Sequence, residues 1–382
     1  MKLCNLYMLN KIFSLFVVSL IFSSCEGGKK NDDQNILLLL FLNSNRVVSN
    51  SVVTTIAGSV TSGLVDGTGT SARFNAPYSV AVDSSGNIFV ADFNNNCIRR
   101  VTSSGVVTTI AGSTTGVSGF VDSTIPSSAR FNQPRGIALD SSGNIYVSER
   151  MNRSIRVISG ATNSVTTLVN RSNSIEFGPN ALIVDSSGNI FATDDSSNSI
   201  RRITSAGAVT TIAGPITIPG PFSVQGPAGF VDGTGSSARF NNPTGIALDS
   251  SGNLVVADSS NNAIRRITSS GVVTTIAGST SGTSGSANGA ASAALFNSPV
   301  GIAIDNSGNI YVSDTFSNTI RRISSSSIVT TIAGDVSRGD SGFADGIGFN
   351  ARFWAPRGLA LDGAGNLIVA DSTNYAIRRV VP

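Results

Sequence analysis

Short apolar stretches alternate with small polar turns along the chain from Ser51 to its end. In each repeat, an apolar stretch ending in Asp is followed by a Gly-Asn turn and by a second apolar stretch that ends in an acid. These stretches are short and rich in Val, Ile and Thr, so they predict β-strands rather than helices. The first stretches are SVAVD (79–83), GIALD (136–140), ALIVD (181–185), GIALD (245–249), GIAID (301–305) and GLALD (358–362).

Two more strands follow in each repeat. The third begins with Ile-Arg at positions 98, 155, 200, 264, 320 and 377, and the fourth is a VTTIAG string at 53–58, 107–112, 209–214, 273–278 and 329–334, replaced by VTTLVN at 165–170. The first two strands are nearly apolar on both faces, as expected of sheets flanked by neighbouring sheets around an axis. This pattern predicts an all-β fold, a six-bladed β-propeller of four-stranded antiparallel blades.

The two ends of the repeated region are complementary. Its first VTTIAG string precedes any first strand, whereas its last unit stops at Val380 and the two residues after it, without such a string. Pairing the two ends would close the ring and remove two exposed sheet edges. We therefore expect Val52–Ala57 to be the outermost strand of the blade that contains residues 357–381, so that the N-terminal strand joins the C-terminal blade.

The run GIALDSSGNLVVADSSNNAIRRI (245–267), followed by VTTIAG, resembles the NHL repeat, and the resemblance covers about residues 51–382. The connector GFVDGTGSSARFN (229–241) is similar to that of bacterial NHL propellers; it recurs at 63–75, 119–132 and 342–353, and more weakly at 288–297. The resemblance implies a propeller that serves either as a binding module or as an enzyme, because one fold hosts many functions. Some six-bladed relatives are metal-dependent lactonases, and others are peptide-amidating lyases.

The N-terminus has the pattern of an export signal. A mildly basic start precedes the apolar run Ile12–Phe22, which is too short to span a bilayer. The run leads into Ser23-Ser24-Cys25, which resembles a bacterial lipobox, whose Cys receives a diacylglycerol. We expect a signal peptide (1–24), a tether (25–50) lipidated at Cys25 with a short apolar run at 36–42, and the propeller (51–382), anchored by lipid in an outer or surface membrane of the cell envelope.

Composition narrows the possible chemistry. The chain has no histidine, which excludes an imidazole base and an imidazole metal ligand. Its only lysines are Lys2, Lys11, Lys29 and Lys30, and without residues 1–24 the net charge falls from +3 to +1. A near-neutral exported domain lacks the basic footprint of a nucleic-acid-binding protein, so we expect no nucleic-acid partner. Cys97 is the single cysteine of the propeller, so we expect no disulfide within it.

Several repeated polar residues have a structural explanation. The Asp that ends each first strand supplies only one carboxylate to its turn, so we expect it to accept backbone N–H groups rather than to bind calcium. We expect the first Arg of each third strand to pair with the acid that ends the second strand. The Arg-Phe pairs of the connectors should plug the joints between blades; they are at 73–74, 130–131, 239–240 and 352–353.

Positions that differ between the repeats are the candidates for a site. The strand directions place the connectors, the starts of the first strands and the loops after the second strands on one face. The residue after each connector Pro and the residue after each second-strand acid vary on that face, and they include aromatic residues and arginines. We expect a binding collar at the mouth of the central channel formed by Tyr78, Phe93, Arg135, Arg150, Asn180 and Arg357.

These features favour a protein- or ligand-binding or scaffold module, monomeric and without cofactor or metal, that takes a protein or carbohydrate ligand on the connector-side face. The propeller contains neither Lys nor His, so no Ser-Lys or Ser-His pair is available for nucleophilic catalysis. The alternative is a metal-dependent lactonase-like hydrolase, in which Glu149 and Asn180 would bring oxygen atoms to a divalent ion in the channel.

Overall fold

The structure, a computed structural model, describes residues 49–170, 177–216, 226–335 and 340–382. The expected signal peptide, the lipidation site Cys25 and the apolar run 36–42 lie outside these residues. Among the described residues, no helix is both long and apolar enough to cross a membrane. The helical elements are one-turn 3₁₀ segments: η1 (Gly69–Ser71), η2 (Phe93–Asn95), η3 (Pro126–Ser128), η4 (Gly235–Ser237), η5 (Ser259–Asn261), η6 (Thr315–Ser317), η7 (Gly348–Asn350) and η8 (Ser372–Asn374).

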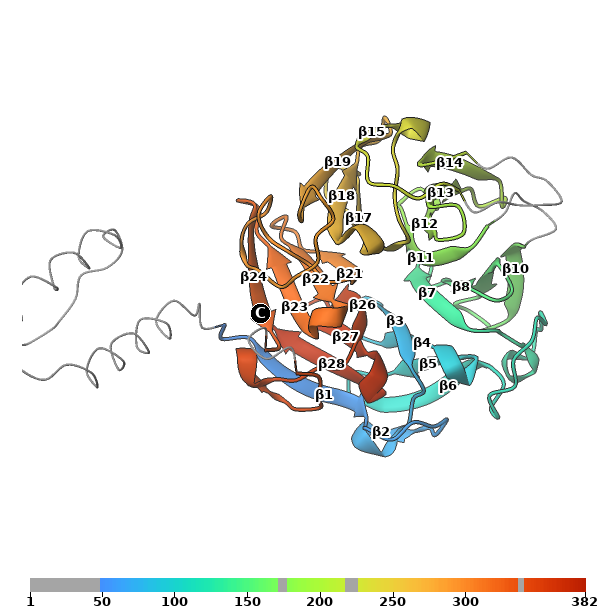
Figure 1. Cartoon of the computed structure of the whole chain (residues 1–382). Coiled ribbons are helices and arrows are strands. Elements are labelled where there is room, and N and C mark those ends of the chain that lie inside the picture. The colour runs from blue at the N-terminus through green and yellow to red at the C-terminus, as the bar shows by residue number, and fades with distance from the viewer. Residues whose placement is uncertain (1–48, 171–176, 217–225, 336–339) are drawn as a thin grey trace, which may run out of the picture. The chain divides into compact units, whose positions relative to one another are not determined.

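Six antiparallel sheets stand around a central axis, which confirms the predicted six-bladed propeller (Figure 1). Blades 1 to 5 each take four consecutive long strands, and blade 6 takes three strands from the C-terminus and one from the N-terminus. Strands with equivalent sequences occupy the same position in all six blades. The repeats therefore share one strand order as well as one sequence pattern.

The innermost strands, in order of blades 1 to 6, are β3 (Pro77–Val82), β7 (Pro134–Leu139), β11 (Pro179–Val184), β16 (Pro243–Leu248), β21 (Pro299–Ile304) and β26 (Pro356–Leu361). The second strands are β4 (Ile88–Asp92), β8 (Ile145–Glu149), β12 (Ile190–Asp194), β17 (Leu254–Asp258), β22 (Ile310–Asp314) and β27 (Leu367–Asp371). The third strands are β5 (Cys97–Val101), β9 (Ser154–Ile158), β13 (Ser199–Ile203), β18 (Ala263–Ile267), β23 (Thr319–Ile323) and β28 (Ala376–Val381). The fourth strands are β6 (Val106–Gly112), β10 (Val165–Val169), β14 (Val209–Ala213), β19 (Val272–Ala277), β24 (Ile328–Ala333) and β1 (Val52–Gly58).

The strand β1 completes blade 6, which confirms that the two ends of the chain close the ring. It pairs antiparallel with β28, from Val52 opposite Val381 to Gly58 opposite Ala376 (Figure 1). It is not the outermost strand, however, because the two-residue strand β25 (Gly346–Ile347) pairs with its other edge. Short connector strands add a fifth strand in the same way to three other blades; they are β2 (Gly67–Thr68) in blade 1, β15 (Gly233–Thr234) in blade 4 and β20 (Gly289–Ala290) in blade 5.

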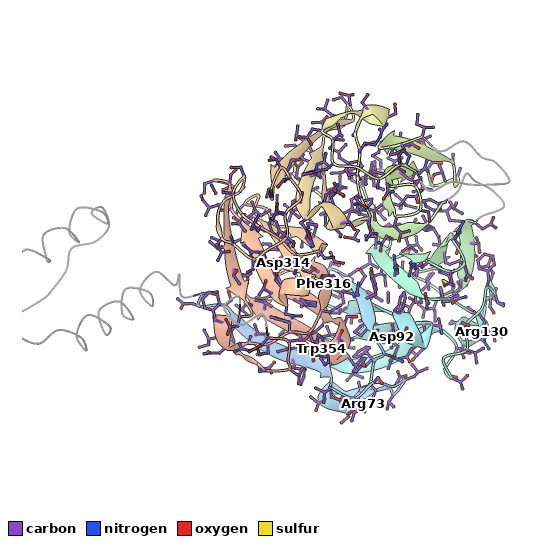
Figure 2. The ribbon with its side chains drawn as sticks, viewed as in Figure 1. Arg73, Asp92, Arg130, Asp314, Phe316 and Trp354 are labelled. Carbon is purple, nitrogen blue, oxygen red and sulfur yellow. The ribbon has the colours of Figure 1, made fainter. Side chains whose placement is uncertain are left out.

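Each of five connectors turns inward after crossing the outer edge of its blade and buries a phenylalanine. Phe74 packs against core residues of both blade 1 and blade 6, so it fills the joint between them. Arg73 beside it donates to the carbonyl oxygens of Thr70 and Ala72 and lies toward the outer rim (Figure 2). The phenylalanines of the four predicted Arg-Phe pairs therefore act as plugs, and Phe296, which was not predicted, does the same in blade 5. The fully buried plug residues are Phe74, Phe131, Phe240, Phe296 and Phe353.

The innermost strands approach one another closely at the connector-side end of the central channel. A Cβ atom on Gly245 or Gly301 would lie 2.1 Å from the carbonyl oxygen of Val300 or Arg357, in the next blade. The hydroxyl of Ser313 accepts from the amide of Gly301 and donates to the carbonyl oxygen of Arg357. These two hydrogen bonds hold the backbone of Arg357, one of the variable positions, at the end of the channel.

Candidate functional site

A buried arginine in the third strand of each blade pairs with the acid that ends the second strand, as predicted. In blade 1, Arg99 Nη1 lies 2.9 Å from Asp92 Oδ2, and neither side chain is exposed to solvent. Burial raises the pKa of Asp92 to about 6 in spite of the adjacent guanidinium. We call these pairs the clamps; the others are Arg156–Glu149, Arg201–Asp194, Arg265–Asp258, Arg321–Asp314 and Arg378–Asp371.

The clamp arginine also holds the connector. Arg99 Nη2 donates to Asp66 of the connector at 2.7 Å and to the carbonyl oxygen of Val65 at 2.9 Å. Its guanidinium carbon lies 5.1 Å from the centre of the Phe74 ring, within the range of a cation–π contact. The hydrogen bonds and ion pairs of the clamp arginines thus stabilise the fold, so other residues are the candidates for a binding site.

The acids at the ends of the first strands stabilise hairpin turns. This confirms the prediction that they accept hydrogen bonds from backbone N–H groups. Asp140 accepts hydrogen bonds from the backbone N–H groups of Ser142 and Asn144 and from the Asn144 side chain. Although partial burial of Asp140 acts to raise its pKa, the hydrogen bonds from Asn144 and Ser142 lower it overall. The equivalent turns at Asp83, Asp185, Asp249, Asp305 and Asp362 have the same hydrogen bonds.

The central channel opens among the variable positions of the connector-side face. It contains a cavity of about 380 Å³ that is lined by residues from all six innermost strands. Tyr78, Arg135, Asn180 and Val300 line it at the connector-side end, and aliphatic residues of the same strands line it further along. The expectation that the first strands are innermost is therefore confirmed. Of the variable residues after the connector Pro, these four line the cavity, whereas Thr244 and Arg357 do not.

Four of the expected collar residues meet around one ring. The Tyr78 ring centre lies 5.5 Å from that of Phe93, which belongs to the same blade. The guanidinium carbons of Arg135 and Arg357 lie 5.1 and 4.8 Å from the centre of the Tyr78 ring. These two arginines come from the blades on either side of blade 1. Residues that are far apart in the sequence thus form one cluster at the channel mouth.

Arg135 and Asn180 are both buried at this mouth. Arg135 Nη1 lies 2.8 Å from Asp195 Oδ2, whereas its Nε has no hydrogen-bond acceptor in the described part of the chain. The amide nitrogen of Asn180 is likewise buried without an acceptor among those residues. Burial of an unpaired donor costs about 1–3 kcal/mol. Such donors in a cavity wall are therefore candidates to contact a ligand.

Two residues named from the sequence lie elsewhere. Arg150 is exposed and does not line the cavity. Glu149 is fully buried in its clamp and accepts hydrogen bonds from Asn132, Asn152 and Ser154 as well as from Arg156. Its carboxylate therefore does not face the channel, where the collar presents mainly N–H donors. These residues do not fit the divalent ion that the lactonase-like alternative requires.

Two exposed aromatic residues in the loops of the connector-side face were not predicted from the sequence. Phe316 is 65% exposed and Trp354 is 49% exposed, on the neighbouring blades 5 and 6 (Figure 2). The backbone N–H of Ala355 donates to Asn318, which ties their two loops together. The sequence does distinguish Trp354, because the other five repeats have Asn or Gly at the equivalent position. Trp354 lies outside the two variable positions of each repeat from which the collar was predicted.

Comparison with known sequences identifies the repeats. The sequence pattern of the NHL repeat matches residues 74–101, 131–158, 240–267 and 296–323. Each match runs from a buried connector phenylalanine to the end of the third strand, in blades 1, 2, 4 and 5. A chloroplastic protein of Arabidopsis thaliana, SUPPRESSOR OF QUENCHING 1, is 34% identical over 97 residues, which are 25% of this chain. The match spans only 9% of that relative's length.

Solved structures share the fold at low sequence identity. An auxiliary nutrient binding protein from Bacteroides thetaiotaomicron superposes with a TM-score of 0.64 at 16% identity, over 87% of this chain and 76% of that one. A gluconolactonase from Xanthomonas campestris superposes with a TM-score of 0.56 at 12% identity, over 86% and 89%. The matched repeats and the six-bladed architecture lead to one assignment: this chain is a six-bladed β-propeller whose blades 1, 2, 4 and 5 carry the NHL repeat.

Proposed function

We propose that this protein is a non-enzymatic binding module that holds a ligand at the connector-side mouth of its channel. The observation that supports this proposal is the convergence of Phe93, Arg135 and Arg357 on the ring of Tyr78. Aromatic residues and arginines are the residue types that most often dominate binding energy at interfaces. We call Tyr78, Phe93, Arg135, Asn180 and Arg357 the collar from here on.

The collar is not needed to build a blade. Its positions after the connector Pro correspond to Thr244 and Val300 in blades 4 and 5, and those blades have the same strand order. The clamps, plugs and turns, in contrast, recur in nearly every blade. A residue that differs between otherwise equivalent blades is free to be selected for binding, because packing of the blade does not require it.

The proposal places the propeller on the cell envelope, held by lipid at Cys25, with a protein or carbohydrate as its ligand and without a nucleic-acid partner or cofactor. We expect it to act as a monomer. The Bacteroides propeller of the same fold is described as an auxiliary nutrient binding protein, which is compatible with a binding role but does not define a ligand here.

Binding arrays test this proposal. Full-length protein in detergent would be applied to arrays of soluble saccharides and short peptides, together with the variants Tyr78→Ala and Arg100→Gln. Arg100 is an exposed arginine of β5 and lies outside the channel lining, so it is the matched control. We expect at least one compound to bind wild type and Arg100→Gln but not Tyr78→Ala. If every bound compound is retained equally by all three proteins, the collar is not the binding site.

A further inference from the structure

Arg357 is not among the residues that line the cavity, but its guanidinium lies over the ring of Tyr78, which does line it. Its guanidinium carbon lies 4.8 Å from the Tyr78 ring centre, and no ion pair or hydrogen bond occupies its N–H groups within the described ranges. A cation over an aromatic face keeps its in-plane donors free for another acceptor. Arg357 thus differs from the six clamp arginines, each of which is paired with an acid.

Two further donors at the same mouth lack acceptors. Asn180 is only 2% exposed as a residue and Arg135 only 8%, yet neither Asn180 Nδ2 nor Arg135 Nε meets an acceptor among the residues that the structure describes. Both residues line the cavity. A buried donor in a cavity wall needs an acceptor atom from a water molecule or from a ligand in the cavity. The mouth is therefore matched to a molecule rich in oxygen acceptors.

The charged collar residues differ in their partners. Arg135 is paired with Asp195 at 2.8 Å, and both side chains are largely buried. Arg357 is the collar cation that has no acidic partner among the residues that the structure describes. A single guanidinium presents a planar pair of N–H groups that matches a carboxylate in a bidentate arrangement. One uncompensated charge is complementary to a monoanion rather than to a phosphate dianion.

We infer that the ligand of the collar is a small hydroxylated monocarboxylate, the chemistry of a sugar acid. Its carboxylate binds Arg357, and its hydroxyl oxygens accept from Asn180 Nδ2 and Arg135 Nε. A cavity of about 380 Å³ is large enough for a molecule of this size. This inference rests on the proposed binding function and assigns its ligand class.

The test uses a matched pair of sugars that differ in charge. Full-length protein would be titrated with D-glucuronate, D-glucose and D-glucose 6-phosphate. Trp354 is the single tryptophan of the chain, lies three residues before Arg357 and is 49% exposed, so its fluorescence is a local reporter. Equilibrium dialysis with labelled sugars would detect binding that does not change the fluorescence. We expect glucuronate to bind saturably and glucose at least about tenfold more weakly, because it lacks the charge-assisted hydrogen bonds.

Variants then locate the interaction. We expect Arg357→Gln to weaken glucuronate binding by about tenfold or more, and Arg100→Gln to leave it unchanged. Circular dichroism and thermal melting would check that both variants are folded. The variant Asn180→Leu removes a proposed hydrogen-bond donor to the ligand without changing the charge of the protein. Equal binding of glucose, tighter binding of glucose 6-phosphate, or undiminished glucuronate binding by Arg357→Gln would each overturn the inference. A neutral ligand lost in Tyr78→Ala would overturn it while leaving the proposed function intact.

Discussion

Arg265 and Arg266 are neighbours in β18, and their side chains have opposite surroundings. Arg265 Nη1 lies 2.7 Å from Asp258 Oδ2, with neither side chain exposed. The Arg266 side chain is 42% exposed, and its Nε lies 3.7 Å from Asp249. Because alternate residues of a strand point to opposite faces, one arginine of the pair joins the core and the other remains at the surface. The repeated Arg-Arg step therefore combines a structural clamp with an ordinary surface charge.

Loss of a clamp arginine should be much more damaging than loss of its neighbour. Arg265→Ala leaves the buried carboxylate of Asp258 uncompensated, so we expect the free energy of unfolding to fall by about 3–5 kcal/mol. Arg266→Ala removes an exposed side chain and should change it by less than about 0.5 kcal/mol. Urea denaturation followed by circular dichroism measures both. Similar denaturation midpoints for the two variants would contradict the clamp as a stabilising contact.

Closure of the ring should depend on the buried face of β1. Val53 is 1% exposed and packs into the core of blades 5 and 6, whereas Thr54 beside it is exposed. Val53→Asp buries a charge without a partner, so we expect a lower melting temperature and aggregation, while Thr54→Asp should remain soluble and folded. Deletion of residues 51–58 exposes the edge of β28 and should aggregate or fail to fold. A soluble deletion variant that unfolds cooperatively would show that closure is dispensable.

The close approach of the innermost strands gives a prediction for glycine. A Cβ atom on Gly301 would lie 2.1 Å from the Arg357 carbonyl oxygen, whereas one on Gly363 would have no neighbour within 4 Å. Gly301→Ala forces β21 and β26 apart, so we expect a loss of about 1–3 kcal/mol in the free energy of unfolding. Gly363→Ala should be nearly neutral. The same chemical denaturation measurement distinguishes them, and equal stability of the two variants would contradict the packing described for the channel mouth.

The clamp acids predict how stability changes with pH. Burial raises the pKa of Asp92, Asp258, Asp314 and Asp371 from 3.8 to about 6. The folded state thus binds these protons more tightly than the unfolded chain does. Their contribution to stability is fully present below about pH 4 and is lost as the pH rises through about 6.

The turn acids have the opposite effect. Asp140, Asp249, Asp305 and Asp362 have lowered pKa values, so their contribution is present above about pH 4 and is lost as the pH falls further. We therefore expect the melting temperature to be highest between about pH 4 and 6 and to be lower at pH 7.5 than at pH 5. The chain has no histidine, so no imidazole titration overlaps this range. A melting temperature that rises steadily from pH 5 to 7.5 would contradict the prediction.

Most of the fold could be predicted because six repeats carry the same information. A strand missing from the last repeat was found at the start of the chain, and β1 does pair with β28. The two-residue strand β25 was not predicted, because Gly346 and Ile347 form no hydrophobic pattern of their own. Its pairing follows from the path of the connector over the outer edge of the blade, which is a tertiary feature.

The candidate site could be predicted only in part. Strand direction placed Tyr78, Arg135 and Arg357 at one mouth, and the structure brings them together. Position in a repeat does not define side-chain surroundings, however. Arg135 is buried against Asp195 whereas Arg150, on the same blade and the same face, is exposed. Long side chains have several rotamers, and the sequence does not indicate which one the neighbouring blades leave available.

The composition of blade 6 has a consequence for biosynthesis. Blades 1 to 5 consist of strands that follow one another along the chain, so each of them can assemble once its own residues have been synthesised. In blade 6, β1 is the first described strand along the chain and its partner β28 is the last. The strand β1 therefore retains an unsatisfied edge until β28 has been synthesised, and a fragment that stops before β28 has nothing to pair with it. Closure of the ring thus distinguishes chains that contain β28 from shorter fragments.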